Sequence, residues 1–234
     1  MKILIIPDVH GRPFWEKAKD LVDTVDKIIF LGDYVDPYGF EGVSQDDAIK
    51  TLKEIIEFAK EYKDKVVLLF GNHCLHYVYD IFKAEASGGR IDKKNYLHIK
   101  QIYFNNLDLF KLAYEIKDND KHYLFSHAGV CKSWYEKYKD LIGELNADNL
   151  NNLLTTNEGI RSLCDVGYSR WGDSKVGSIV WADVDDHKIG QLENIYQIFG
   201  HTQQAESEQI KDNYACLDVR KCFLLENNTL KRLD

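Results

Sequence analysis

Six side chains of metal-binding type stand in five short motifs that lie beside apolar runs. The motifs are DVHG at residues 8–11, GDYVD at 32–36, GNH at 71–73, HAG at 127–129 and GHT at 200–202. They supply Asp8, His10, Asp33, Asn72, His127 and His201. Two divalent cations held around one carboxylate can cut a phosphoester with water. The set therefore predicts a metal-dependent phosphoester hydrolase.

The first third of the chain has a pattern of alternating strands and helices. Apolar runs predict strands at residues 2–7, 27–31 and 65–70, and the stretches between them predict helices at about 14–25 and 45–62. Apolar runs that do not alternate with polar residues are typical of strands buried on both faces. This third is therefore predicted to be a βαβαβ unit.

Four of the polar side chains come at the predicted carboxyl ends of strands, namely Asp8, Asp33, Asn72 and His127. Ligands of open α/β sheets bind in the crevice beyond those ends. Loops that are far apart in the sequence are therefore expected to converge on one site, with a rigid sheet behind them.

The whole chain, residues 1–234, is interpreted as one domain, because 234 residues are too few for two comfortable halves. Two helical inserts are predicted, one at about 74–121 with an interruption at 87–89, and one at about 132–174. Short strands are predicted at 195–233, where they contain a hairpin at Asn227 and Asn228 and complete a second sheet.

Composition limits the classes of partner. Lys and Arg total 30 against 38 Asp and Glu, a formal charge of −8, so no overall positive field attracts bulk nucleic acid. The apolar run at residues 3–6 is too short for a signal sequence or a membrane span, which predicts a cytoplasmic protein without membrane contact. Five cysteines without a C-x-x-C pair predict reduced thiols.

The five motifs, in this order from residue 8 to residue 202, resemble the calcineurin-like metallophosphoesterase family. Within that family the chain is similar to the phosphoprotein-phosphatase branch, which includes Ser/Thr phosphatases, phage-type phosphatases and bacterial diadenosine tetraphosphatases. VWAD at 180–183 also fits that branch. The resemblance implies an α/β fold in which two mixed β-sheets pack as a sandwich flanked by helices.

The resemblance also implies a dinuclear metal centre with a bridging hydroxide as the nucleophile. By position, the first metal is expected on Asp8, His10 and Asp33, and the second on Asp33, Asn72, His127 and His201. Oxygen and imidazole ligands suit several divalent metals. Manganese is favoured from the resemblance, with iron, zinc, cobalt and nickel as alternatives.

His73 matches the family histidine that protonates the leaving oxygen, and Asp36 matches the carboxylate that orients its imidazole. General acid catalysis contributes roughly 10²–10⁴ in rate. Asp36 has an alternative interpretation as a turn residue before Pro37.

One departure from the branch concerns phosphate binding. After GDYVD the branch has an arginine that binds phosphate, and this chain has Pro37. A guanidinium can bind two phosphate oxygens at once. Arg12, Arg170 and Arg90 are the candidate replacements, with Arg12 preferred because it follows the turn at His10, and an ordinary surface role is the alternative for each.

The sequence leaves the substrate open between a phosphoprotein and a nucleoside polyphosphate. Four aromatic residues could stack on a base, although ordinary packing is the favoured interpretation: Tyr34, Tyr38, Tyr168 and Trp171. A hypothesis from another class is a catalytically inactive metal-binding interaction module.

Overall fold

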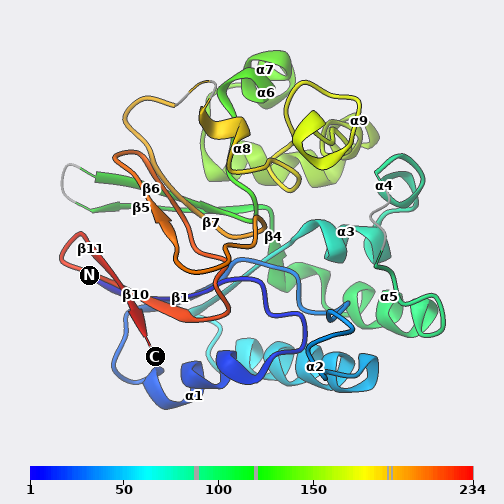
Figure 1. The fold of residues 1–234 in the computed structure, drawn as a ribbon, viewed down its shortest axis with the longest axis vertical. Coiled ribbons are helices and arrows are strands. Elements are labelled where there is room, and N and C mark those ends of the chain that lie inside the picture. The colour runs from blue at the N-terminus through cyan, green and yellow to red at the C-terminus, as the bar shows by residue number, and fades with distance from the viewer. Residues whose placement is uncertain (87–89, 119–120, 189, 191, 234) are drawn as a thin grey trace.

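Two mixed β-sheets lie face to face with helices outside them (Figure 1). The computed structural model describes residues 1–86, 90–118, 121–188, 190 and 192–233. The first sheet has the strand order β11-β10-β1-β2-β3-β4, and the second has the order β5-β6-β7-β9-β8. The prediction of an α/β sandwich flanked by helices is confirmed.

The first sheet contains the three strands predicted in the first third. Its members are β1 (Lys2–Ile6), β2 (Lys27–Phe30), β3 (Val66–Leu69), β4 (Phe110–Lys111), β10 (Cys222–Glu226) and β11 (Thr229–Leu233). β1 to β4 are parallel, and β10 pairs antiparallel with β1 and β11. Strand β1 is buried on both faces, because Ile3 and Ile5 pack against the second sheet while Leu4 and Ile6 belong to the core beneath the helices.

Two helices cover the outer face of this sheet, α1 (Lys17–Leu21) and α2 (Gln45–Glu61). Helix α2 begins at a capping box, in which the Ser44 hydroxyl accepts from the Asp47 amide at 3.0 Å and the Asp47 carboxylate accepts from the Ser44 amide at 3.4 Å. The helix predicted at 14–25 is instead a 3₁₀ turn, η1 (Pro13–Glu16), followed by the short α1. The Thr24 amide and hydroxyl both donate to the Leu21 carbonyl, which ends the helix early.

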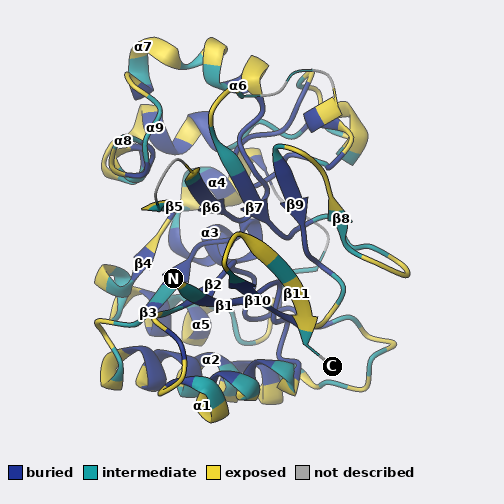
Figure 2. Cartoon of the chain, turned by 90° about the vertical axis from the view of Figure 1, so that its left-hand side faces the viewer, coloured by how far each residue is buried: buried dark blue, intermediate teal, exposed yellow. Residues whose placement is uncertain are grey.

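The second sheet packs against the first through a cluster of apolar side chains. It consists of β5 (Ala113–Asp118), β6 (Lys121–Ser126), β7 (Tyr196–Phe199), β8 (Gln209–Ile210) and β9 (Tyr214–Cys216). Phe125 and Ile198 from this sheet meet Ile29 and Phe223 from the first. Figure 2 shows that the central strands such as β1 and β7 are buried, whereas β11 and the outer helical faces are largely exposed.

Two expectations about the later strands need correction. The stretch 74–121 is not wholly helical: it contains α3 (Asn72–Val78), which begins before it, α4 (Asp80–Glu85), α5 (Tyr96–Phe104) and η2 (Leu107–Leu109), and then the strands β4, β5 and the start of β6. The interruption expected at 87–89 lies outside the described residues. The C-terminal strands do not all join the second sheet, because β10 and β11 extend the first. Their hairpin turns at Asn227 and Asn228 as predicted, with φ of 49° and 59°.

The stretch 132–174 is helical as expected and lies over the second sheet (Figure 1). It contains α6 (Lys132–Lys137), α7 (Lys139–Ile142), α8 (Ala147–Asn152), η3 (Leu153–Thr155), α9 (Asn157–Ser162) and η4 (Tyr168–Arg170), and η5 (Asp186–Lys188) follows. In the described part of the chain, none of the helices is long and apolar enough to cross a membrane.

Candidate metal centre and active site

The predicted metal ligands lie together where strands of both sheets end. Asp8, Asp33 and Asn72 follow β1, β2 and β3, while His127 follows β6 and His201 follows β7. One ligand atom from each of Asp8, Asp33, His127 and His201 lies within 4.8 Å of the others, and these four residues are buried. The remaining two predicted ligands contact this group, as described next.

Backbone carbonyls fix the tautomers of two histidines. Nδ1 of His10 lies 2.7 Å from the Val35 carbonyl oxygen, and Nδ1 of His127 lies 2.8 Å from the Leu31 carbonyl oxygen. A carbonyl oxygen only accepts, so Nδ1 carries a proton in both rings and Nε2 is the nitrogen that remains for another partner. The two Nε2 atoms lie 3.7 Å and 3.4 Å from Oδ2 of Asp33. Histidines that bind metal are held in this way.

The donor atoms crowd most closely around His127. Its Nε2 lies 3.0 Å from Oδ1 of Asn72 and 3.0 Å from Nδ1 of His201. Burial alone would lower the pKa of His127, but the carboxylates of Asp33 and Asp8 outweigh it and raise the pKa to about 9. The two carboxylates thus favour positive charge at this position. Carboxylate, amide and imidazole atoms that converge in this way fit divalent metals.

The backbone around these ligands is tightly constrained. His10, Asp33 and His201 adopt left-handed conformations, with φ of 45°, 50° and 62°. A Cβ atom at Gly71 would collide with the Asp33 carboxylate, and a Cβ atom at Gly200 would collide with the Asp8 carboxylate. These two glycines are required because the backbone passes directly against the ligands.

His73 and Asp36 form the expected pair. Nδ1 of His73 lies 2.8 Å from Oδ2 of Asp36, and both residues are buried. The other carboxylate oxygen of Asp36 accepts from the Tyr77 hydroxyl at 2.6 Å and from the Asp92 amide at 3.2 Å. Burial and the Asp36 carboxylate raise the pKa of Tyr77, which keeps this hydroxyl a donor. Asp36 therefore holds the His73 ring in one orientation.

Arg12, the preferred candidate for phosphate binding, points away from the site cavity toward Glu41. Its Nε and Nη2 atoms donate to the Glu41 carboxylate at 2.7 and 3.1 Å, and Nη1 donates to the Asp8 carbonyl at 3.0 Å. The left-handed turn at Gly11 (φ 75°) precedes this side chain. Arg12 thus braces the loop that carries Asp8 and does not line the site cavity described below.

Arg90 and Arg170 do face that cavity, whose volume is about 730 Å³. The Arg90 guanidinium lies 3.5 Å from the centre of the Tyr38 ring, donates to the Asp36 carbonyl, and has Nη2 3.4 Å from Nε2 of His73. Arg170 is more firmly engaged, with Nε 2.8 Å from the Asp183 carboxylate and Nη2 donating to the Thr202 hydroxyl at 2.9 Å.

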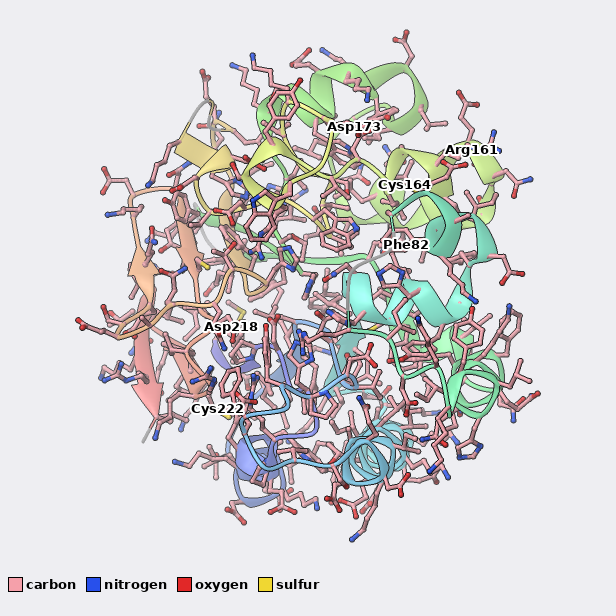
Figure 3. All side chains as sticks on the ribbon, turned by 45° about the vertical axis from the view of Figure 1, so that its right-hand side comes forward. Phe82, Arg161, Cys164, Asp173, Asp218 and Cys222 are labelled. Atoms are coloured by element: carbon pink, nitrogen blue, oxygen red, sulfur yellow. The ribbon has the colours of Figure 1, made fainter. Side chains whose placement is uncertain are left out.

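The cavity is lined both by predicted metal ligands, such as Asp8 and His201, and by residues of the helical part of the molecule. Figure 3 shows Cys164 and Asp173, which line it, in the upper helical part and Asp218 on the opposite side. Asp218 was missed from the sequence, although it follows β9 as Asp8 follows β1. Burial and the nearby Asp8 carboxylate raise its pKa well above the ordinary value.

A family model described as calcineurin-like phosphoesterase matches residues 1–205. Among solved structures, a cold-active protein-tyrosine phosphatase of a psychrophilic Shewanella species is 18% identical with a TM-score of 0.59, covering 100% of this chain and 80% of that chain. The phosphoesterase Yfce from E. coli is 12% identical with a TM-score of 0.41, covering 98% of this chain and 91% of that chain. No curated protein matches the chain.

Proposed function

Because the chain belongs to the calcineurin-like phosphoesterase family, we propose that it is a two-metal phosphomonoesterase. We propose further that its active site is of the Ser/Thr-phosphatase type and that its substrate is a phosphoprotein. One observation carries the proposal: the buried cluster of metal-binding side chains adjoins an oriented histidine. The rings of His10 and His73 lie 5.2 Å apart, so a phosphate at the cluster would also reach the second histidine.

The residues that would hold the metals are those predicted from the sequence. One ion would be held by Asp8, His10 and Asp33. The other would be held by Asp33, Asn72, His127 and His201. The chemistry that such ions supply when bound is Lewis-acid activation of the phosphate and of a water molecule. Manganese is the proposed metal.

The proposed role of His73 is to protonate the leaving oxygen. Asp36 accepts the Nδ1 proton and is itself fixed by Tyr77, so Nε2 is the atom directed toward the cavity. A proton held at Nε2 can pass to the leaving oxygen only if the ring does not rotate. The Asp36 contact prevents that rotation.

The proposed phosphate-binding arginine is Arg90, in place of the residue that Pro37 displaces. Its guanidinium is presented on the Tyr38 ring beside His73, at 3.5 Å from the ring centre. From there two N–H groups can bind two phosphate oxygens. Arg170 has a different proposed role, since its bonds to Thr202 and to the His201 carbonyl hold the turn that carries His201.

A phosphoprotein is proposed over a nucleoside polyphosphate because of charge. The lining of the cavity includes Asp173 and also Glu85, which pairs with Arg161 at 3.3 Å, and these carboxylates would repel additional phosphates. The inactive-module hypothesis is disfavoured because a binding module does not need a buried carboxylate that orients a histidine.

The test is hydrolysis of para-nitrophenyl phosphate by chelator-stripped protein with and without manganese. A His73→Asn variant should lose roughly 10²–10⁴ in rate and keep its bound metal. His122→Asn is the matched control, because His122 pairs with Glu115 on strand β5 at 2.9 Å. Bound metal without turnover on a broad panel of phosphoesters would instead support the inactive module.

A further inference from the structure

The four aromatic residues considered for base stacking differ sharply in their surroundings. Tyr34 is fully buried and donates to the Leu69 carbonyl at 2.9 Å. Tyr38 carries the Arg90 guanidinium. Tyr168 is 65% exposed and is not part of the cavity lining, whereas Trp171 is 97% exposed and lines the cavity. Trp171 alone of these four thus presents a free ring to a ligand in the cavity.

An exposed indole is unusual, because Trp is normally among the most buried side chains. Trp171 also adopts a left-handed conformation, with φ 58° and ψ 23°, which is unfavourable for a bulky residue. The fold tolerates both costs at one position at the mouth of the proposed active site. Such strain is found at ligand-binding positions.

The loop that carries Trp171 is held in a defined shape. The Trp171 amide donates to the Tyr168 carbonyl at 3.0 Å, the Gly172 amide to the Gly167 carbonyl at 3.0 Å, and the Tyr168 amide to the Ser174 carbonyl at 2.9 Å. Arg170, the preceding residue, is bonded to Thr202 beside the metal ligand His201. The backbone of this loop is therefore fixed relative to the His201 turn through the Arg170 side chain.

The cavity has room for much more than a phosphate. Its volume of about 730 Å³ lies within the range of roughly 300–1,000 Å³ for pockets that enclose organic ligands. Its lining includes the apolar residues Ala84, Ala86, Cys164 and Val166, together with Trp181, whose ring packs edge-on against His201 with the ring centres 5.6 Å apart. An ester whose organic part is apolar and planar would fill this region beside the Trp171 ring.

We propose that Trp171 and this apolar lining form a subsite for the aromatic ring of an aryl phosphate, with the ring stacked on the indole while the phosphate lies at the metal centre. The inference rests on the proposed phosphomonoesterase function and names its substrate class. Glu85 and Asp173 in the same cavity disfavour a ring that carries further phosphates. The ring can belong to a free aryl phosphate or to a phosphotyrosine side chain.

The test compares Trp171→Ala with wild type in the manganese-loaded protein. The substrates are phenyl phosphate, a phosphotyrosine peptide, the same peptide with phosphoserine, and AMP. We expect KM for the two aryl substrates to rise about tenfold, with kcat nearly unchanged and no change for phosphoserine. Trp171→Phe should restore most of the affinity. Tyr168→Ala, on the same loop and outside the cavity, is the matched control.

Comparing variants on one substrate removes differences in leaving-group reactivity. Activity on phenyl phosphate but not on the phosphotyrosine peptide would assign the subsite to small aryl phosphates. An equal loss on phosphotyrosine and phosphoserine, or a loss confined to AMP, would overturn the proposal.

A binding measurement separates this inference from the proposed function. Benzylphosphonate and ethylphosphonate are not hydrolysed, and calorimetry on the manganese-loaded protein reports their affinities even if no ester is turned over. Trp171→Ala should weaken the binding of benzylphosphonate about tenfold and leave the affinity for ethylphosphonate unchanged. Equal affinities of the two phosphonates for the wild-type protein would rule out the ring subsite, whatever the catalytic result.

Discussion

Arg90→Ala gives the sharpest test of how the chain binds phosphate without an arginine at Pro37. The guanidinium is already held on Tyr38 and by the Asp36 carbonyl, so little entropy is lost when phosphate binds. Two charge-assisted hydrogen bonds at about 1.5 kcal/mol each amount to about 3 kcal/mol. This predicts a loss of roughly 150-fold in kcat/KM. Arg90→Lys keeps the charge and loses the fork, and it should recover about tenfold.

The assay is steady-state hydrolysis of para-nitrophenyl phosphate with manganese, together with inhibition by inorganic phosphate and measurement of bound metal. Arg232→Ala is the control, because Arg232 pairs with Glu208 at 3.2 Å on strand β11 and is not part of the cavity lining. Metal content should be unchanged in both variants. A loss smaller than threefold in Arg90→Ala, with phosphate inhibition intact, would refute the assignment of Arg90.

Three further outcomes follow from the same geometry. Asp36→Asn should lower kcat about a hundredfold, because His73 loses the carboxylate acceptor for its Nδ1 proton. The metal content, measured by elemental analysis, should not change. A loss of bound metal as large as the loss of activity would contradict this prediction. Gly71→Ala should abolish tight metal binding, since its Cβ would collide with Asp33, whereas Gly39→Ala has open space and should bind metal normally in a calorimetric titration. Saturation with manganese at about 100 times Kd should add about 2.7 kcal/mol of stability. For 234 residues this raises Tm by about 5 °C in calorimetry, and an unchanged Tm would argue against a metal site.

The sequence was sufficient to predict those features that depend on local pattern. The apolar runs before Asp8, Asp33 and Asn72 are strands of the first sheet, and their polar ends converge as the strand-end argument requires. Both sheets and their helical cover were expected from the family resemblance. The helix predicted at 14–25 begins as a 3₁₀ turn and ends at Leu21, where Thr24 bonds the Leu21 carbonyl, a contact that periodicity does not report.

The sequence named Arg12, Arg170 and Arg90 as candidates but could not rank them correctly, because their roles depend on contacts between distant residues. Arg90 reaches the site because Tyr38, from a different loop, lies beneath its guanidinium, and neither residue belongs to a recognisable motif. Arg12 was preferred for its place after His10, yet Glu41 binds its guanidinium, and Glu41 is itself shared with Arg220 at 2.9 Å. Closeness in sequence to a predicted metal ligand therefore does not show which arginine can bind phosphate.

The left-handed residues of the site bear on how this protein could be altered by selection. His10, Asp33, Asp36 and His201 have φ between 45° and 62°, and such conformations cost on the order of 1 kcal/mol or more each in a residue with a side chain. Glycine or asparagine at these positions would relax the backbone and raise the free energy of unfolding. A library screened only for heat resistance would therefore enrich replacements at the positions proposed to bind metal and to orient His73, and the most heat-resistant variants would be the least active ones.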